Sequence, residues 1–166
     1  MKKQKVAIVT AASKGIGAAC ATQLASEGYK LVLMSRSDSL FALCDQLNAR
    51  PLQGSIEDEN DIARLVGFTY EKYGRIDAVV CNTGHASKGS LLSLTDSDWE
   101  KGMNLLLMNV IRLAKSIGPI MAKQKGGAFV NISTFGAKEP SLSFPISSVI
   151  RAAVSSYCKL FASELG

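Results

Sequence analysis

The stretch KVAIVTAASKGIG, residues 5–17, carries the pattern that decides the fold. Its first seven residues are mostly apolar, which is typical of a strand buried on both faces. Its end is rich in glycine, and helical spacing of apolar residues begins at Gly15 and continues to Glu27. Such a strand, running directly into a glycine-rich turn and a helix, predicts a phosphate site, because the first-turn N–H groups and the helix dipole favour an anion.

Short apolar strands alternate with longer helical patterns over the rest of the chain. Strands are expected at residues 5–11, 29–35, 51–54, 76–82 and 128–133, and helices at 15–27, 39–48, 59–73, 97–122 and 147–165. Five buried strands separated by helices specify a parallel sheet covered on both faces, with right-handed crossovers. We therefore predict one domain, residues 1–166, with an α/β Rossmann-type doubly wound sheet of strand order 3-2-1-4-5.

Charge and cysteine content argue against several classes of function. The net charge is +5, but the basic residues are scattered apart from MKKQK at residues 1–5, so nucleic-acid binding is not expected. The four cysteines form no CxxC pair, and the one histidine, His85, has no second ligand at metal-binding spacing. We expect no metal site and no disulfide framework, which fits a reducing cytoplasm. Neither a signal peptide nor an apolar run of about 18 residues for a membrane span is expected.

The residues after the second strand select the cofactor in a fold of this kind. An acidic side chain there binds a ribose 2′-hydroxyl, whereas an arginine accepts a 2′-phosphate. The chain has Arg36 at this place, with no carboxylate before Asp38, and Lys14 adds a positive charge from the turn. The sequence therefore predicts NADP(H) rather than NAD. The alternative is that Arg36 and Lys14 are ordinary surface charges.

Three motifs at these spacings resemble the short-chain dehydrogenase/reductase family: TAASKGIG at residues 10–17, CNTG at 81–84 and NIST at 131–134. DSDW at residues 96–99, before a long helix, adds to the likeness, which covers the whole chain. The 3-oxoacyl-acyl-carrier-protein reductases look most similar. The resemblance implies a Rossmann fold, a nicotinamide cofactor, a small-molecule substrate, and a homo-oligomer (dimer or tetramer) built on the two long helices.

The resemblance also assigns cofactor-binding residues. They are Thr10, Ser13, Lys14, Gly15, Ile16 and Gly17 around the pyrophosphate, Arg36 as the NADP-selecting arginine, and Ser55, Asn82 and Gly84 on the adenosine side. The first glycine of the family's turn is Ala11 in this chain. Alanine costs little there if φ is negative, but it is strained where φ is positive.

The catalytic residues depart from the family pattern of Asn, Ser, Tyr and Lys. The Ser place is Thr134, with Ser133 as its neighbour, the Tyr place is Ser147, the Lys place is Arg151, and the Asn place is Leu106. In the family the Tyr donates the proton, and the Lys lowers the Tyr pKa and holds the ribose. A serine hydroxyl is far less acidic than a phenol, whose pKa is about 10, so Ser147 is a poor substitute as general acid.

Other roles for these residues stay open. The stretch ISSVIRAAV, residues 146–154, puts Ser147 and Arg151 one helical turn apart on one face. Ser147 is also a suitable N-cap for the last helix, because a serine side chain accepts from a free first-turn N–H. His85 is either a proton carrier near the substrate or a loop residue that faces solvent.

Two functions are compatible with these residues. The first is an NADP(H)-dependent oxidoreductase that transfers hydride to a carbonyl, with Thr134 or Ser133 polarising the carbonyl and Arg151 holding the ribose. The second is a catalytically silent dinucleotide-binding protein that acts as a sensor or an oligomer subunit. The missing Tyr favours the second. The family usually continues past the last helix with further strands, so we also expect a truncated chain whose fifth strand is an uncovered edge.

Overall fold

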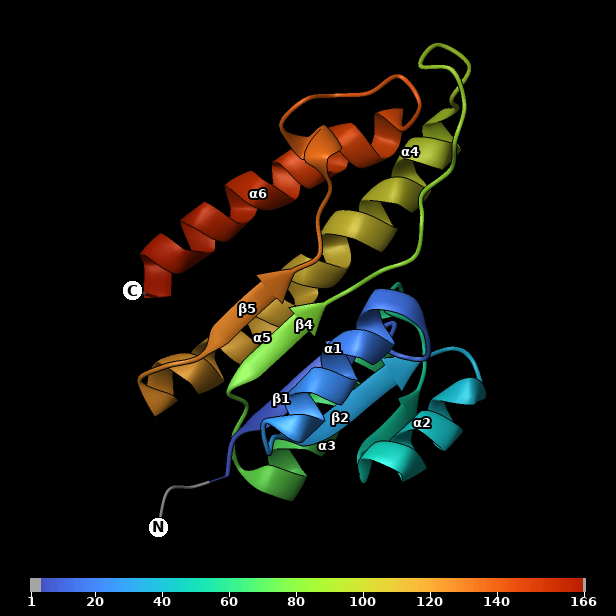
Figure 1. The fold of residues 1–166 in the computed structure, drawn as a ribbon. Helices are drawn as coiled ribbons and strands as arrows, with labels where there is room; N and C mark the ends of the chain where they lie inside the picture. Colours follow the sequence, from blue (N-terminus) through green and yellow to red (C-terminus); the bar gives the residue numbers. More distant parts are fainter. Residues whose placement is uncertain (1–3, 166) are drawn as a thin grey trace.

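A computed structural model describes residues 4–165 of the chain (Figure 1). It confirms the predicted parallel sheet and its strand order, β3-β2-β1-β4-β5. The strands are β1 (Val6–Thr10), β2 (Lys30–Ser35), β3 (Arg50–Gln53), β4 (Ala78–Cys81) and β5 (Ala128–Asn131). Because all pairs are parallel, the carboxyl ends of the five strands meet at one edge, where open α/β sheets bind ligands.

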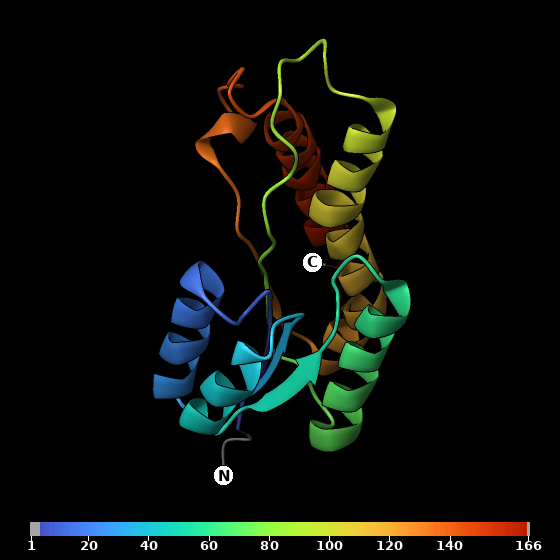
Figure 2. The ribbon, with the colours of Figure 1, turned by 90° about the vertical axis from the view of Figure 1, so that its right-hand side faces the viewer.

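Helices cover both faces of the sheet, as Figure 2 shows. On one face lie α1 (Gly15–Ser26) and α2 (Ser39–Leu47), and on the other α3 (Glu59–Tyr73), α5 (Asn109–Gln124) and α6 (Pro145–Leu165). Successive residues of a strand point to opposite faces. Ile8 accordingly belongs to the buried cluster that includes Ile117, whereas Val9 belongs to the cluster that includes Leu40.

The long helix expected at residues 97–122 is a continuous helical segment from Asp96 to Gln124. It consists of α4 (Asp96–Met103), the π-helical turn η1 (Asn104–Met108) and α5. A capping box of Thr95 and Asp98 begins it. By length and composition alone this helix could cross a membrane, but Leu113 and Ile117 on it are fully buried against the sheet.

The last helix, α6, begins at Pro145, two residues earlier than predicted. Proline suits the first helical position because it lacks the N–H that would have no partner there. The Ser148 N–H donates to the Phe144 carbonyl at 2.9 Å, so Phe144 takes the cap position. The prediction that Ser147 caps this helix is therefore wrong, and Ser147 lies in its first turn.

Strand β5 is an edge strand in the described sheet, with β4 as its only neighbour. Its Phe129 packs against Phe161 of α6 in an edge-to-face arrangement, with 5.1 Å between the ring centroids. Val130 points to the opposite face and is 48% exposed. One face of this edge is therefore covered by helices, and the other is open.

Candidate functional site

The turn between β1 and α1 contains two left-handed residues. Ala11 has φ of +46° and Gly15 has φ of +56°. This conformation is free of strain for glycine but costs an alanine about 1–2 kcal/mol. Hydrogen bonds hold Ala11 in place: the Asn82 side-chain amide donates to its carbonyl at 3.1 Å, and the next residue's N–H donates to the Met34 carbonyl at 3.0 Å. Of the two alternatives that the sequence left open for Ala11, the strained one with positive φ therefore applies.

Gly17 lets helix α1 approach the strand ends closely. A Cβ at this position would lie 2.5 Å from the Ala11 carbonyl oxygen and 2.8 Å from the Asn82 side-chain nitrogen. Both distances are far shorter than an ordinary van der Waals contact. Gly17 is buried, and the absence of a side chain there allows the amino end of α1 to pack against the edge of the sheet.

Thr10 and Asn82 join the carboxyl ends of β1 and β4. The Thr10 hydroxyl donates to the Asn82 carbonyl at 2.8 Å, and it accepts from the Asn82 backbone N–H at 2.9 Å. Thr10 is completely buried. It therefore positions the segment that starts at Asn82.

A groove of about 650 Å³ lies along this edge of the sheet. This volume is in the range of small-molecule and cofactor sites. The predicted cofactor residues that line it are Ser13, Lys14, Gly15, Ile16, Arg36, Asn82 and Gly84. Ala11 and Thr83, which belong to the quoted motifs, line it as well. The sequence analysis did not single out Glu57 or Leu105, and it did not assign His85 to a cofactor site. The predicted residues Thr10, Gly17 and Ser55 do not line the groove.

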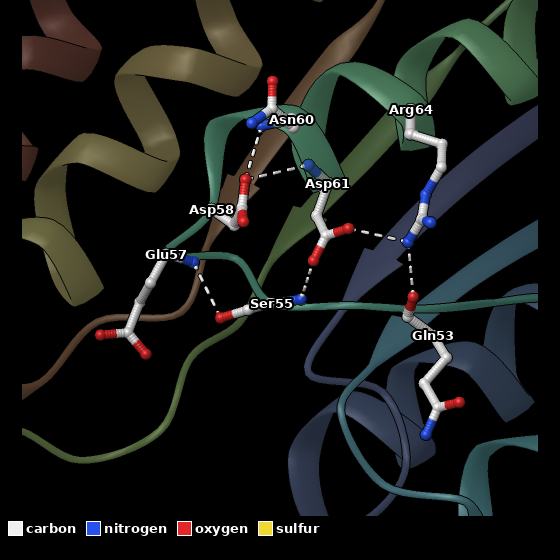
Figure 3. A network of polar contacts seen from close by, with 7 residues as sticks. All are labelled: Gln53, Ser55, Glu57, Asp58, Asn60, Asp61 and Arg64. Atoms are coloured by element: carbon white, nitrogen blue, oxygen red, sulfur yellow. Dashed lines mark hydrogen bonds and ion pairs between the residues drawn. The ribbon is translucent and has the colours of Figure 1, made fainter.

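Ser55 belongs to a polar network that orders the start of α3 (Figure 3). Its backbone N–H donates to the Asp61 carboxylate at 2.8 Å, and its hydroxyl accepts from the Glu57 N–H at 3.2 Å. The Asp58 side chain caps α3, and Arg64 pairs with Asp61 at 2.8 Å. Ser55 thus helps to hold the loop that carries Glu57 to the groove.

The charge at the Arg36 end of the groove is mixed. The Arg36 guanidinium is well exposed and lies 3.8 Å from the Glu57 carboxylate. Lys14 also lines the groove.

The sequence analysis missed Glu57 as a groove residue. The signal that could have revealed it is its place in the loop directly after β3, at the same edge of the sheet as the glycine-rich turn.

The four predicted catalytic residues come together only in part. Ser147 and Arg151 line a small cavity of about 40 Å³ beside the groove. The Arg151 guanidinium donates to the Ile132 carbonyl and, at 3.1 Å, to the Thr83 hydroxyl. Ser133 and Thr134 are exposed and line neither the groove nor this cavity.

The residue to which the resemblance assigns the family's asparagine place, Leu106, has apolar surroundings. Leu106 is buried in a cluster with Ile146 and Ile150 at the start of α6. Neither nearby asparagine substitutes for it: the Asn104 amide donates to the Glu57 carbonyl at 3.1 Å, and the Asn109 amide donates to the Leu105 carbonyl. No polar chain of side chains therefore connects this turn with Ser147 among the described residues.

The four cysteines are free thiols. Burial raises the pKa of Cys44 to about 11, and it raises the pKa of Cys81 as well. Both thiols are protonated at neutral pH, so neither is an activated nucleophile. Among residues 4–165, no three His, Cys, Asp or Glu side chains gather closely enough to hold a metal ion.

A family model described as short chain dehydrogenase matches residues 5–166. The chain belongs to the short chain dehydrogenase family. A 3-oxoacyl-[acyl-carrier-protein] reductase of Synechocystis sp. is 30% identical over 168 residues, which cover 97% of this chain and 68% of that protein. The dehydrogenase/reductase SDR family member 4 of Caenorhabditis elegans is 34% identical over 141 residues, which cover 80% of this chain and 54% of that protein.

Solved structures of the family share the fold. L-sorbose reductase from Gluconobacter frateurii, complexed with NADPH and L-sorbose, superposes with a TM-score of 0.89 at 29% identity, covering 98% of this chain and 64% of that one. A short-chain dehydrogenase from Streptomyces avermitilis superposes with a TM-score of 0.93 at 26% identity, covering 99% and 61%. The chain thus spans between about half and about two thirds of the length of these relatives.

Proposed function

We propose that the protein binds NADP(H) in the groove and acts as an oxidoreductase on a carbonyl or hydroxyl substrate. Its cofactor-binding residues resemble those of a 3-oxoacyl-acyl-carrier-protein reductase. The observation that carries the proposal is the groove itself. The amino end of α1, the Arg36 side chain and the segment from Asn82 to Gly84 all line it. The family resemblance assigned these same three parts of the sequence to one bound cofactor.

The amino end of α1 suits a pyrophosphate. No side chain caps this 12-residue helix, and no acidic residue lies in its first turn. Its first-turn N–H groups are therefore not satisfied by a cap, and no carboxylate opposes an anion. At Gly15 nothing lies within 4 Å of the place of a Cβ, so the groove is open where a phosphate would approach the backbone.

The exposed arginine supports NADP(H) over NAD(H). At 3.8 Å from Glu57, the Arg36 guanidinium is held weakly and can turn towards a 2′-phosphate. The L-sorbose reductase structure, which has a comparable fold, contains NADPH.

A bound nicotinamide cofactor supplies or accepts the hydride. The family resemblance assigns the nicotinamide ribose to Arg151 and the carbonyl to Thr134 or Ser133, but Ser133 and Thr134 line neither the groove nor the cavity. Ser147 does not replace a phenol as proton donor, so the proton comes from elsewhere, such as water. Losing a general acid typically costs about 10²–10⁴ in rate, so we expect slow turnover.

The second candidate is a catalytically silent dinucleotide-binding protein that serves as a sensor or an oligomer subunit. The specific observation that favours it is the apolar cluster of Leu106, Ile146 and Ile150. The family resemblance puts the proton path at Leu106, so apolar surroundings there support a protein without turnover.

Cofactor titration of the full-length protein tests the proposal, followed by NADPH oxidation with ketones and 3-oxoacyl thioesters. Tighter binding of NADPH than of NADH with measurable turnover is the expected result. NADPH binding without turnover on any substrate would leave only the silent binding protein, and preference for NADH would remove the argument from Arg36.

We also propose that the protein is cytoplasmic and forms a homo-oligomer through the two long helices. Val149 and Leu160 of α6 are 54% and 68% exposed, which leaves apolar surface for a second copy. Light scattering after gel filtration measures the mass, and a monomer at micromolar concentration would contradict the proposal.

A further inference from the structure

Arg151 is a half-buried cation without a carboxylate partner among residues 4–165. The ion pairs of these residues involve Arg36, Arg64 and Arg75 instead. Both hydrogen-bond partners of Arg151 are neutral oxygens. Burial lowers the pKa of Arg151, and no nearby negative charge offsets this effect. A guanidinium has five N–H donors, so donors remain for a further partner.

The cavity beside Arg151 is cationic. It is lined by Ser147, His85 and Lys88 as well as Arg151, and by no aspartate or glutamate. The Lys88 ammonium lies 5.0 Å from the centre of the Phe144 ring, and Phe144 lines the same cavity. A volume of about 40 Å³ has room for one or two water-sized groups, which is the size of a carboxylate.

The cavity adjoins the proposed cofactor groove. Gly84 and His85 line both spaces, so the two are in contact through this segment. A small group held in the cavity would leave the rest of its molecule directed towards the groove.

We propose that this cavity binds the carboxylate of a small organic acid, held by Arg151 with Ser147 and Lys88. The planar guanidinium fork matches a carboxylate with two parallel hydrogen bonds, which a lysine at this position does not provide. If the proposed oxidoreductase function holds, the substrate class is a short oxo or hydroxy acid. Only this last step rests on the proposed function, because the carboxylate site itself needs no cofactor.

The single histidine makes a direct test possible, because the imidazole resonances of His85 are free of overlap with other histidines and report on the cavity and on the groove that His85 also lines. The full-length protein is titrated with acetoacetate and, separately, with its neutral methyl ester. We expect acetoacetate to shift the His85 resonances in a saturable manner. The ester should bind at least about tenfold more weakly, since it lacks the charge that Arg151 recognises.

Variants locate the site. Arg151→Gln should weaken acetoacetate binding by about tenfold or more, and Lys88→Gln by about threefold. Lys159→Gln removes the same charge from an exposed position on the same helix and should change nothing. If Arg151→Gln does not fold, the acetoacetate affinities of Lys88→Gln and Ser147→Ala test the site instead. Unchanged affinity in these variants, or equal binding of acid and ester, overturns the proposal.

A parallel titration with NADPH separates the two possible sources of the anion. If NADPH alone produces the Arg151-dependent shift and competes with acetoacetate, Arg151 serves the cofactor, as the family resemblance assigns it, and the carboxylate site is overturned. Binding of acetoacetate without any binding of NADPH would support the carboxylate site and overturn the proposed function. Binding of NADPH without any binding of acetoacetate would support the proposed function and overturn the carboxylate site.

Discussion

The turn around Gly17 and the cavity around Ser147 belong to one candidate site, but their residues have different ties to the fold. At the turn, Gly17, Thr10 and Asn82 are needed for the sheet and α1 to pack, so their replacement would disturb the fold. At the cavity, Ser147 and Arg151 lie on α6, whose buried packing is made by the apolar residues Ile146, Ile150 and Val154. Residues that shape the backbone are tied to the fold, whereas residues that perform the chemistry can change while the fold remains.

The sharpest test of this contrast restores the missing chemistry. Ser147→Tyr combined with Arg151→Lys should raise NADPH-dependent carbonyl reduction by about 10²–10⁴, because a phenol next to a cation is a competent proton donor. Steady-state kinetics measure the effect, with Arg151→Lys alone as the control. Equal rates in the double variant and the control would show that the apolar cluster around Leu106, or the pocket itself, also blocks catalysis.

The next effect concerns the turn. Gly17→Ala should lower the free energy of unfolding by about 1–3 kcal/mol and weaken NADPH binding, because the new methyl group overlaps the Ala11 carbonyl. Urea denaturation and NADPH titration measure both quantities. Gly67→Ala in α3, where nothing lies within 4 Å, is the matched control and should stabilise by about 0.5–1 kcal/mol. Similar changes in the two variants would contradict a special packing role for Gly17.

A smaller effect is expected at the mixed charge of Arg36 and Glu57. Arg36→Gln should weaken NADPH binding by about tenfold, since a charge-assisted hydrogen bond to the 2′-phosphate is lost. Glu57→Gln should strengthen it by about threefold, because a carboxylate no longer competes for the guanidinium. Dissociation constants for NADH serve as the control, and parallel changes for NADH and NADPH would remove Arg36 as the selecting residue.

The smallest effect is expected at Ala11. Ala11→Gly relieves the strain of a positive φ but adds backbone entropy to the unfolded state, so we expect a net stabilisation of about 0.5–1 kcal/mol. Thermal unfolding measures the change. Destabilisation instead would show that the left-handed conformation costs this alanine little.

The sequence by itself determined the sheet order, and seven of its ten predicted cofactor residues line the groove. The periodicity of apolar residues depends on each element's own geometry, so strands, helices and the glycine-rich turn are visible locally. The long helix was predicted within two residues at each end, although its π-helical turn at Asn104–Met108 was not. The cap of α6 was misassigned, because Pro145 and Ser147 are both good starting residues and the local pattern does not rank them.

Only the tertiary structure decided which distant residues meet. Glu57 reaches Arg36 through the network that orders α3, and Arg151 reaches Thr83, 68 positions earlier in the chain. Such contacts depend on how α6 packs beside the ends of β4 and β5, which no local pattern encodes. For the same reason, the cationic cavity of Arg151, Lys88 and His85 became visible only in the folded chain.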